Sequence, residues 1–486
     1  MKLTAGTFHE HRAVIWVILL FTAMRLATAP FFGLGVDEAH YLLYAKHLDL
    51  SYFDHPPLVG WVHALFYYTL GTNELLARIP AIILLALTSI LCYRFILQFG
   101  SSKEAFYGTL ALNSSFMFGA LGIGLVPETL LLPLVFLIIF SVKRVEKDSA
   151  VSGYLWLGIV LGLAGLAKYT AILFVPALVM YLLLQRRLDI LLNPRLAVTA
   201  VVALLVISPV IIWNVSNDFI SLKYQGEHVV GGEGMQFKTL YYSLVTQFGA
   251  YSPPLFCIAL FGLARSVRVY FDRLKLPVLL GGVPFLFFLY ASCYKRALPH
   301  WSAVFYLLFI PIGIVLLSRS HHKLARRILV FSLGLSVVLS VAAHFELAFK
   351  LFRFPDYKSP FRDICGVAAA VQQANNIMIS DTSSGKNRAL AVTNWTVASR
   401  VFYYSDHFGS EVFLIDKRRD QFYLWRSHDP AGYDLLFINT HFYKRDIQNE
   451  FLCSAVEDAG TYDITLHGGK VDTVKYVWCR NFGGLK

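Results

Sequence analysis

Two acidic clusters stand close together, directly after the first apolar stretch of the chain. The first holds Asp37 and Glu38, and the second is Tyr52-Phe53-Asp54-His55-Pro56-Pro57. A carboxylate near hydrocarbon loses hydration, so ionisable residues at membrane depth are candidates for function. One Asp-Glu pair alone would equally suit a solvated acidic loop. The second cluster, so near the first, favours a site.

The composition indicates a polytopic α-helical membrane protein. Of the 486 residues, 56% are hydrophobic and 15% are charged, and apolar stretches long enough to span a membrane recur. We expect about eleven transmembrane helices, over 13–32, 78–99, 104–121, 126–142, 154–167, 169–185, 196–213, 241–263, 277–292, 301–318 and 325–345. Hydropathy falls after about residue 348. We therefore expect a transmembrane domain over 1–347, with its first outer loop at 33–77, and a soluble domain over 348–486.

Basic residues in the short loops predict the orientation. With the N-terminus in the cytoplasm, seventeen Lys and Arg residues fall on the inner side, against six on the outer side. Cytoplasmic loops carry such an excess, and an odd number of spans then places the C-terminal domain outside. The net charge of +12 follows from this topology and does not indicate a nucleic-acid partner.

The first apolar stretch has one feature of a secretory signal, because Ala27-Thr28-Ala29 looks like a cleavage site. Arg25 lies inside the boundary region, and cleavage would leave an even number of spans. We therefore expect an uncleaved first helix.

On this topology, further polar residues gather at the outer boundary of the membrane. Glu128 begins a span, Lys168 lies between two spans, and His300 occupies an outer turn. Glu128 alone would suit a helix N-terminus, and Lys168 alone would suit a side chain that reaches the lipid headgroups. Together they indicate an outward-facing cavity in which acids and cations converge. Such a cavity suits a substrate with a lipid tail and a phosphate head.

The predicted outer domain has an α/β pattern. Asp434–Asn439 is a short buried-strand pattern, and Ile364–Ala374 is a plausible helix. The sequence shows no nucleophile elbow, phosphate loop or zinc motif there, so we expect a lid or an acceptor-docking domain, with a purely structural role as the alternative. Cys453 and Cys479 both lie in this domain, and an oxidising compartment permits them to pair. The sequence leaves their pairing open, because it does not give their separation.

Several of these motifs resemble those of a known family. Asp37-Glu38-x-x-Tyr41 resembles the first-loop motif of the integral-membrane glycosyltransferases that use a polyprenyl-phosphate sugar, namely the protein O-mannosyltransferases and the lipid A aminoarabinose transferase. The segment from Asn73-Glu74 to Arg78-Ile79-Pro80 matches the next family segment. Four further motifs are closer to rhizobial lipid A and core galacturonosyltransferases: Asp54-His55-Pro56-Pro57, Trp213-Asn214, Pro299-His300-Trp301 and Arg419-Asp420-Gln421-Phe422.

The resemblance implies a GT-C-like fold and an inverting glycosyltransferase of the bacterial inner membrane. Its partners would be a polyprenyl-phosphate-linked sugar donor, membrane lipids, and a lipid or glycan acceptor such as lipid A, the lipopolysaccharide core or another envelope glycan. Asp37 would take the acceptor's hydroxyl proton, and Glu38 would orient the loop or the acceptor. Cations would neutralise the departing phosphate. The donor-binding candidates are Lys168, Arg78, His55 and Tyr41, with Asp54, Glu128 and His300 in support.

The chain departs from the aminoarabinose transferase pattern at two positions. Asp54-His55 stands where that enzyme has Glu-Lys, and Glu128 stands where many relatives have Asp. Histidine is a weaker, pH-dependent cation, and together with Asp54 and Glu128 it offers ligands to a divalent metal ion. The donor sugar and a metal cofactor therefore stay open.

A transporter or flippase of a lipid-linked or anionic substrate is the alternative function. Such proteins show repeated halves and interrupted helices near the membrane midplane. We find no internal repeat in this sequence, and the charged residues gather at one interface. Both observations favour the transferase.

Overall fold

The computed structural model describes residues 5–230, 234–382 and 387–486, and the chain divides into two compact units. We call the first the membrane unit; it contains Met1–Thr28, Asp49–Val62 and Arg78–Phe345. We call the second the tail unit; it contains Ala29–Leu48, His63–Ala77 and Glu346–Lys486. Two pieces of the predicted first outer loop thus belong to the tail unit.

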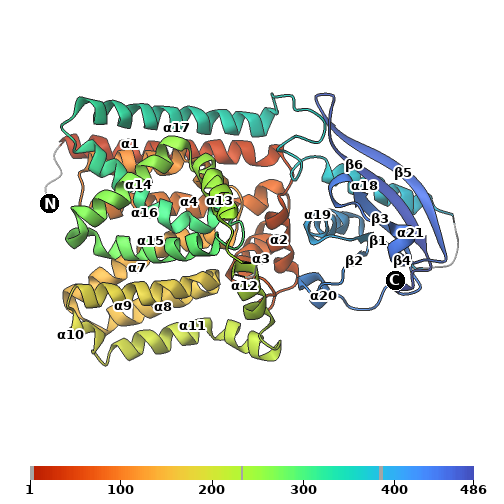
Figure 1. The fold of residues 1–486 in the computed structure, drawn as a ribbon, viewed down its shortest axis with the longest axis horizontal. Coiled ribbons are helices and arrows are strands. Elements are labelled where there is room, and N and C mark those ends of the chain that lie inside the picture. Colours follow the sequence, from red (N-terminus) through yellow and green to blue (C-terminus); the bar gives the residue numbers. More distant parts are fainter. Residues whose placement is uncertain (1–4, 231–233, 383–386) are drawn as a thin grey trace. The chain divides into compact units, whose positions relative to one another are not determined.

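The membrane unit is built from helices (Figure 1). Its long apolar helices and their neighbours are α1 (Ala5–Thr28), α4 (Glu74–Ile96), α5 (Ser102–Ser114), α6 (Phe116–Leu121), α7 (Pro127–Asp148), α8 (Val151–Ala167), α9 (Phe174–Leu184), α11 (Leu196–Ser216), α12 (Ile220–Val230), α13 (Phe237–Ala250), α14 (Pro253–Arg268), α15 (Phe271–Ala291), α16 (Ala303–Ser318) and α17 (Lys323–Phe349). A short helix, α10 (Leu188–Leu191), follows α9, and α3 (Leu58–Leu70) precedes α4. Several of these helices contain prolines, which membrane helices tolerate because neighbouring groups satisfy the freed carbonyls.

Six helices among the described residues are long and apolar enough to cross a membrane, or seven if a bent pair counts as one span. They are His11–Phe31, Glu74–Ile96, Leu196–Ser216, Phe271–Ala291, Pro299–Ser318 and Lys323–Phe349. The chain is therefore a multi-pass membrane protein, as predicted. Because other apolar helices, such as α8, are shorter, the predicted count of eleven stays a prediction.

The predicted span 241–263 is not a single helix. Helices α13 and α14 cover this region and meet at an angle of 111°. Ser252 between them has a positive φ of 66°, which a right-handed helix cannot contain. Pro253 and Pro254 follow, and neither carries the N–H that would continue α13. This local break was not visible in the hydropathy pattern.

Glycines hold α8 close against α11. A Cβ added at Gly158 would lie 2.7 Å from the carbonyl oxygen of Thr199, and one at Gly162 would lie 2.5 Å from Cβ of Val206. Such contacts are shorter than real Cβ atoms allow, so only glycine permits this approach. Small residues play this part where membrane helices pack closely. The packing fixes the end of α8, where Lys168 begins the next turn.

The tail unit is an α/β structure, as predicted. Its five-stranded sheet has the order β2-β1-β3-β6-β5, with parallel pairing between β1, β2 and β3 and antiparallel pairing of β3 with β6 and of β6 with β5 (Figure 1). The strands are β1 (Arg388–Val392), β2 (Val412–Leu414), β3 (Asp434–Thr440), β5 (Ala455–Leu466) and β6 (Gly469–Arg480), and β4 (Phe451–Leu452) pairs with β7 (Gly484–Leu485). The main helices are α2 (Val36–Lys46), α18 (Val367–Ser380), α19 (Trp395–Ser405) and the short α20 (Gln421–Trp425) and α21 (Ile447–Glu450).

Strand β3 is buried along its whole length, because the sheet is covered on both faces. Leu436 and Ile438 belong to one hydrophobic cluster, while Leu435 and Phe437 belong to the other. The first cluster also contains Leu42 of α2. A helix from the first outer loop therefore completes the core of the tail unit.

Two elements predicted for the tail are present. The predicted strand Asp434–Asn439 is β3, and the predicted helix Ile364–Ala374 is α18, which begins later at Val367. The delay has a local cause, since Gly366 is in the left-handed conformation, with φ of 74°, and ends the preceding turn before the helix starts.

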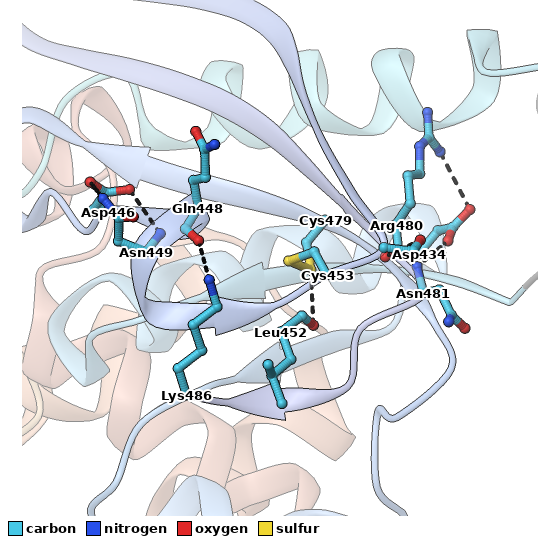
Figure 2. Close-up of a disulfide and its surroundings, with 11 residues drawn as sticks. Asp434, Asp446, Gln448, Asn449, Leu452, Cys453, Cys479, Arg480, Asn481 and Lys486 are labelled. Carbon is cyan, nitrogen blue, oxygen red and sulfur yellow. Dashed lines mark hydrogen bonds and ion pairs between the residues drawn. A yellow bond between two sulfur atoms is a disulfide. The ribbon is translucent and has the colours of Figure 1, made fainter.

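A disulfide joins Cys453, which follows β4, to Cys479 in β6 (Figure 2). Their Cα atoms are 5.2 Å apart. The bond ties the edge segment around β4 to the central part of the sheet, and it resolves the pairing that the sequence left open.

Removing this disulfide should destabilise the tail unit. The double variant Cys453→Ala/Cys479→Ala opens a loop of 26 residues in the unfolded chain. The gain in chain entropy should lower the free energy of unfolding by about 3.5 kcal/mol. We expect the unfolding midpoint of the purified protein to fall accordingly. The control is Cys365→Ala, because Cys365 is a free cysteine of the same unit. If maleimide labels both Cys453 and Cys479 without reduction, the bond does not form in the cell.

Candidate functional site

The centre of the candidate site in the membrane unit is a buried ion pair. Lys168 caps the end of α8, and its Nζ donates to Oε1 of Glu128 in the first turn of α7. Lys168 is 6% exposed and Glu128 is 4% exposed. Two charges removed from water in this way depend on each other, because either alone would be an uncompensated buried charge.

Two histidines lie near this pair. His300, in the 3-10 turn Pro299–Ser302, places its Nε2 3.5 Å from Oε1 of Glu128. His55 is also close enough to act electrostatically on Glu128. The structure thus brings together four of the residues selected from the sequence.

A small cavity of about 10 Å³ lies beside the pair. Lys168, Glu128, His300 and the apolar rings of Phe288 and Trp301 line it. Nζ of Lys168 is 5.7 Å from the centre of the Phe288 ring, within the range of a cation–π contact. The cavity is lined by charged and aromatic side chains, and its volume is that of about one water molecule.

The loop that carries Asp54 and His55 is fastened to the same region. Trp213 donates from Nε1 to Oδ2 of Asp49 (2.8 Å), and Ser221 donates from Oγ to the carbonyl of Tyr52 (2.8 Å). The carbonyl of Asp54 accepts from the side-chain amide of Gln225. Helices α11 and α12 therefore hold this loop in place.

Tyr169 links the loop to the ion pair. Its hydroxyl lies 3.3 Å from Oγ of Ser51 and 3.4 Å from Nδ2 of Asn214, and it directly follows Lys168 in the chain. The sequence analysis missed Tyr169, Ser51 and Asp49, since none of them stands in a recognisable motif. Trp213-Asn214 was noted only as part of the resemblance, and its hydrogen-bond partners are distant in sequence.

Arg78, another predicted donor-binding residue, lies in α4 and is fully buried. Among the described residues no three His, Cys, Asp or Glu side chains are placed to hold a metal ion. Asp54, His55 and Glu128, the ligands considered from the sequence, therefore do not form such a group.

Asp37 and Glu38 stand in the first turn of α2, in the tail unit. Oε2 of Glu38 accepts from the N–H of Gly35 (2.9 Å) and caps the helix. This contact lies within the first turn of α2, and Asp37 is half-buried beside it. The predicted orienting role of Glu38 stays a prediction. Tyr41 is buried, and its ring packs against those of His40 and Tyr44.

Comparison with known proteins shows several likenesses. The model of the dolichyl-phosphate-mannose-protein mannosyltransferase family matches residues 54–213. The lipid A galacturonosyltransferase RgtD of Rhizobium johnstonii is 24% identical over 314 residues, which are 61% of this chain and 63% of that protein. The chain thus aligns with somewhat less than two thirds of this relative.

Among solved structures, ArnT from Cupriavidus metallidurans bound to undecaprenyl phosphate matches 96% of this chain and 97% of its own, with a TM-score of 0.66 and 14% identity. The archaeal oligosaccharyltransferase AglB from Archaeoglobus fulgidus matches 82% of this chain and 64% of its own, with a TM-score of 0.53 and 10% identity. The chain has a GT-C-like fold. The resemblance predicted from the motifs is confirmed.

Within this GT-C-like chain, the family model covers the loop at 54–57 and both members of the ion pair. It ends at Trp213, the residue that anchors the loop through Asp49. The matched segment therefore includes both members of the ion pair and part of the loop and helices that surround them.

The ion pair should show strong coupling in stability. Glu128→Gln or Lys168→Met alone leaves a buried charge without its partner, which costs about 3–5 kcal/mol. The double variant removes both charges, so its loss of stability should be clearly smaller than the sum of the losses in the two single variants. Thermal unfolding of the purified protein in detergent measures all three. Asp189→Asn, which breaks the exposed pair with Arg187, should cost at most about 1 kcal/mol. Additive losses in the double variant would contradict the pairing.

Proposed function

We propose that this protein is an inverting glycosyltransferase that moves a monosaccharide from a polyprenyl-phosphate carrier to an envelope lipid or glycan. The observation that carries the proposal is the buried Lys168 at the end of α8, held by Glu128 beside a small cavity lined by charged and aromatic side chains. A cation in such surroundings interacts with a phosphate far more strongly than it would in water.

The name of the relative RgtD and the ligand of ArnT support the choice of substrates. The first acts on lipid A by its name, and the second binds undecaprenyl phosphate. We infer by analogy a polyprenyl-phosphate donor and an acceptor of the lipid A or lipopolysaccharide-core type. The site would then lie on the outer side of a bacterial inner membrane, with the tail unit in the periplasm. The excess of basic residues in the opposite loops supports this orientation.

In the proposed reaction, the oxygen of an acceptor hydroxyl attacks the anomeric carbon from the face opposite the phosphate. Asp37 takes the hydroxyl proton as the new carbon–oxygen bond forms. The bond between the anomeric carbon and the phosphate oxygen breaks, and its electron pair stays on the phosphate. The carrier phosphate thereby gains one negative charge, which Lys168 stabilises, with His55 and Arg78 in support. Lysine has three N–H donors, so a phosphate can bind while Glu128 keeps one of them.

Asp37→Asn should abolish most of the activity. Asparagine keeps the shape of the side chain but cannot take the proton, so the transfer rate should fall by about a hundredfold or more. Transfer of sugar by the purified variant, at saturating donor and acceptor, measures this. Asp429→Asn, an exposed acid of the same unit, serves as the control and should retain the wild-type rate. A near-normal rate in Asp37→Asn would remove Asp37 from the role of base.

Lys168→Ala should weaken the use of the lipid-linked donor. Loss of the cation removes the partner of the phosphate, so the turnover rate and the apparent donor affinity should both decline. Lys168→Arg should recover part of the activity, because it keeps the charge but places it differently. Transfer is measured over a range of polyprenyl-phosphate-sugar concentrations. Lys295→Ala, an exposed outer lysine of the same unit, is the control. A Lys168→Ala curve like that of the wild type would exclude this assignment.

A further inference from the structure

The tail unit contains a second cavity, of about 240 Å³, that the proposed mechanism does not use. Its lining comes from four separate parts of the tail unit. They are residues 30–34 after the first apolar helix, Glu74 at the start of α4, residues 363, 364 and 366–368 around the start of α18, and Tyr404 in α19. Pockets for drug-sized ligands begin at about 300 Å³. This cavity therefore suits a smaller ligand, of the size of one sugar ring.

Several polar groups that line the cavity are joined by hydrogen bonds. Oε1 of Glu74 accepts from the hydroxyl of Tyr404 (3.1 Å), and that hydroxyl accepts from the N–H of Leu34 (3.0 Å). Burial raises the pKa of Tyr404, so the phenol stays a protonated donor. Gly33 allows this approach, because a Cβ there would lie 2.9 Å from the Tyr404 hydroxyl oxygen. The wall beside Glu74 is thus rigid and well placed to present a carboxylate.

The opposite wall offers donors. Val367 and Ala368 of the first turn of α18 line the cavity. Gly366 caps this helix without a side chain, and the first turn contains no acid. The first N–H groups of a helix have no partner within it. The first turn of α18, the acidic residues Glu74 and Asp363 and the aromatic residues Phe31 and Phe32 line one space. Asp363 is ion-paired there, because its Oδ1 lies 3.5 Å from Nε of Arg362 and 3.5 Å from Nη2 of Arg400.

This combination matches a sugar ring better than a phosphate. Hydroxyl groups both donate and accept hydrogen bonds, so they can use the carboxylates and the helix N–H groups together. The apolar face of a sugar ring suits the aromatic side chains. A phosphate would meet the carboxylate of Glu74, which carries a charge of its own sign and makes the contact unfavourable.

A smaller cavity adjoins this one and shares Asp363 and Val367 with it. Arg400, 5% exposed, donates there to the carbonyl of Asp363 (2.7 Å). Thr440 also lines this smaller cavity, is nine-tenths buried, and its Oγ1 has no hydrogen-bond partner among the described residues. A buried hydroxyl without a partner is costly, and a polar substituent of a ligand would satisfy it.

We propose that the cavity between Glu74 and the start of α18 binds one sugar ring of the acceptor. The assignment rests on the proposed function, because it gives the acceptor its place in the reaction. The chain itself supports it: Leu34 lines the cavity, and Asp37, the proposed base, is three residues further on. Three residues span at most about 10 Å. A hydroxyl at the mouth of the cavity is therefore within the region that Asp37 serves.

The test fills the cavity without breaking a hydrogen bond. Ala368→Phe places a ring in the space, while Ala369→Phe makes the same change at the next residue, which is exposed and does not line the cavity. Both changes carry the same helix-propensity cost. Ala368→Ser leaves the cavity open. It is the control for effects of a substitution at this position that do not come from filling the cavity. Equal unfolding temperatures show that the variants fold.

The probe is lipid A, bound to the full-length protein in phosphatidylcholine nanodiscs. We expect Ala368→Phe to weaken binding by about tenfold or more through the clash, with Ala369→Phe and Ala368→Ser like the wild type. Dephosphorylated lipid A should bind with similar affinity, and phosphatidic acid should not compete. In transfer assays the acceptor KM should rise in Ala368→Phe while the donor KM is unchanged.

The outcomes separate the two proposals. Equal binding of lipid A by Ala368→Phe and Ala369→Phe would overturn the acceptor cavity, even if the wild type transfers sugar. Dependence of binding on the phosphates, or no saturable binding by the wild type, would also overturn it. Selective loss of binding in Ala368→Phe without any transfer by the wild type would support a glycan site and overturn the transferase.

Discussion

The membrane unit depends on one buried pair of opposite charges. Lys168 and Glu128 are both buried, so each offsets part of the desolvation penalty of the other only while they stay in contact. The contact joins the end of α8 to the start of α7. The glycines that bring α8 against α11 fix one side of this arrangement. The cation of Lys168 thus lies in a buried setting beside the ring of Phe288.

Hydrogen bonds connect the region of the ion pair to the loop that contains Asp49 and His55. Tyr169 follows Lys168 and contacts Ser51 and Asn214, while Trp213 next to Asn214 holds Asp49. The loop with His55 is therefore fixed by α11 and α12, and α11 also packs against α8, which ends at Lys168. Changes in one of these residues should affect the others, because they form one connected network.

The parts that the sequence predicted well depend on local patterns. Apolar stretches marked the helices, the period of Asp434–Asn439 marked a buried strand, and charges at span ends marked Glu128, Lys168 and His300, which the structure places together. The roles of these residues stay predictions.

The features that were missed depend on single backbone angles or on distant partners. Ser252 breaks a predicted span through one positive φ, and Gly366 delays a helix in the same way. The bond from Trp213 to Asp49 joins residues far apart in sequence. Hydropathy is averaged over a segment, so its pattern predicts neither a single backbone angle nor a contact between residues distant in sequence.

The packing of α2 shows that the tail unit includes more than the residues after the last apolar helix. The fall in hydropathy near residue 348 marks the end of the apolar helices, but the tail unit also takes in Ala29–Leu48 and His63–Ala77. Leu42 and Leu43 of α2 are buried in the same cluster as Leu436 and Val474 of the sheet. Without the sheet, this face of α2 would be exposed to water, at a cost set by the apolar area. The tail unit therefore includes α2, the helix that carries Asp37, and supports it through packing.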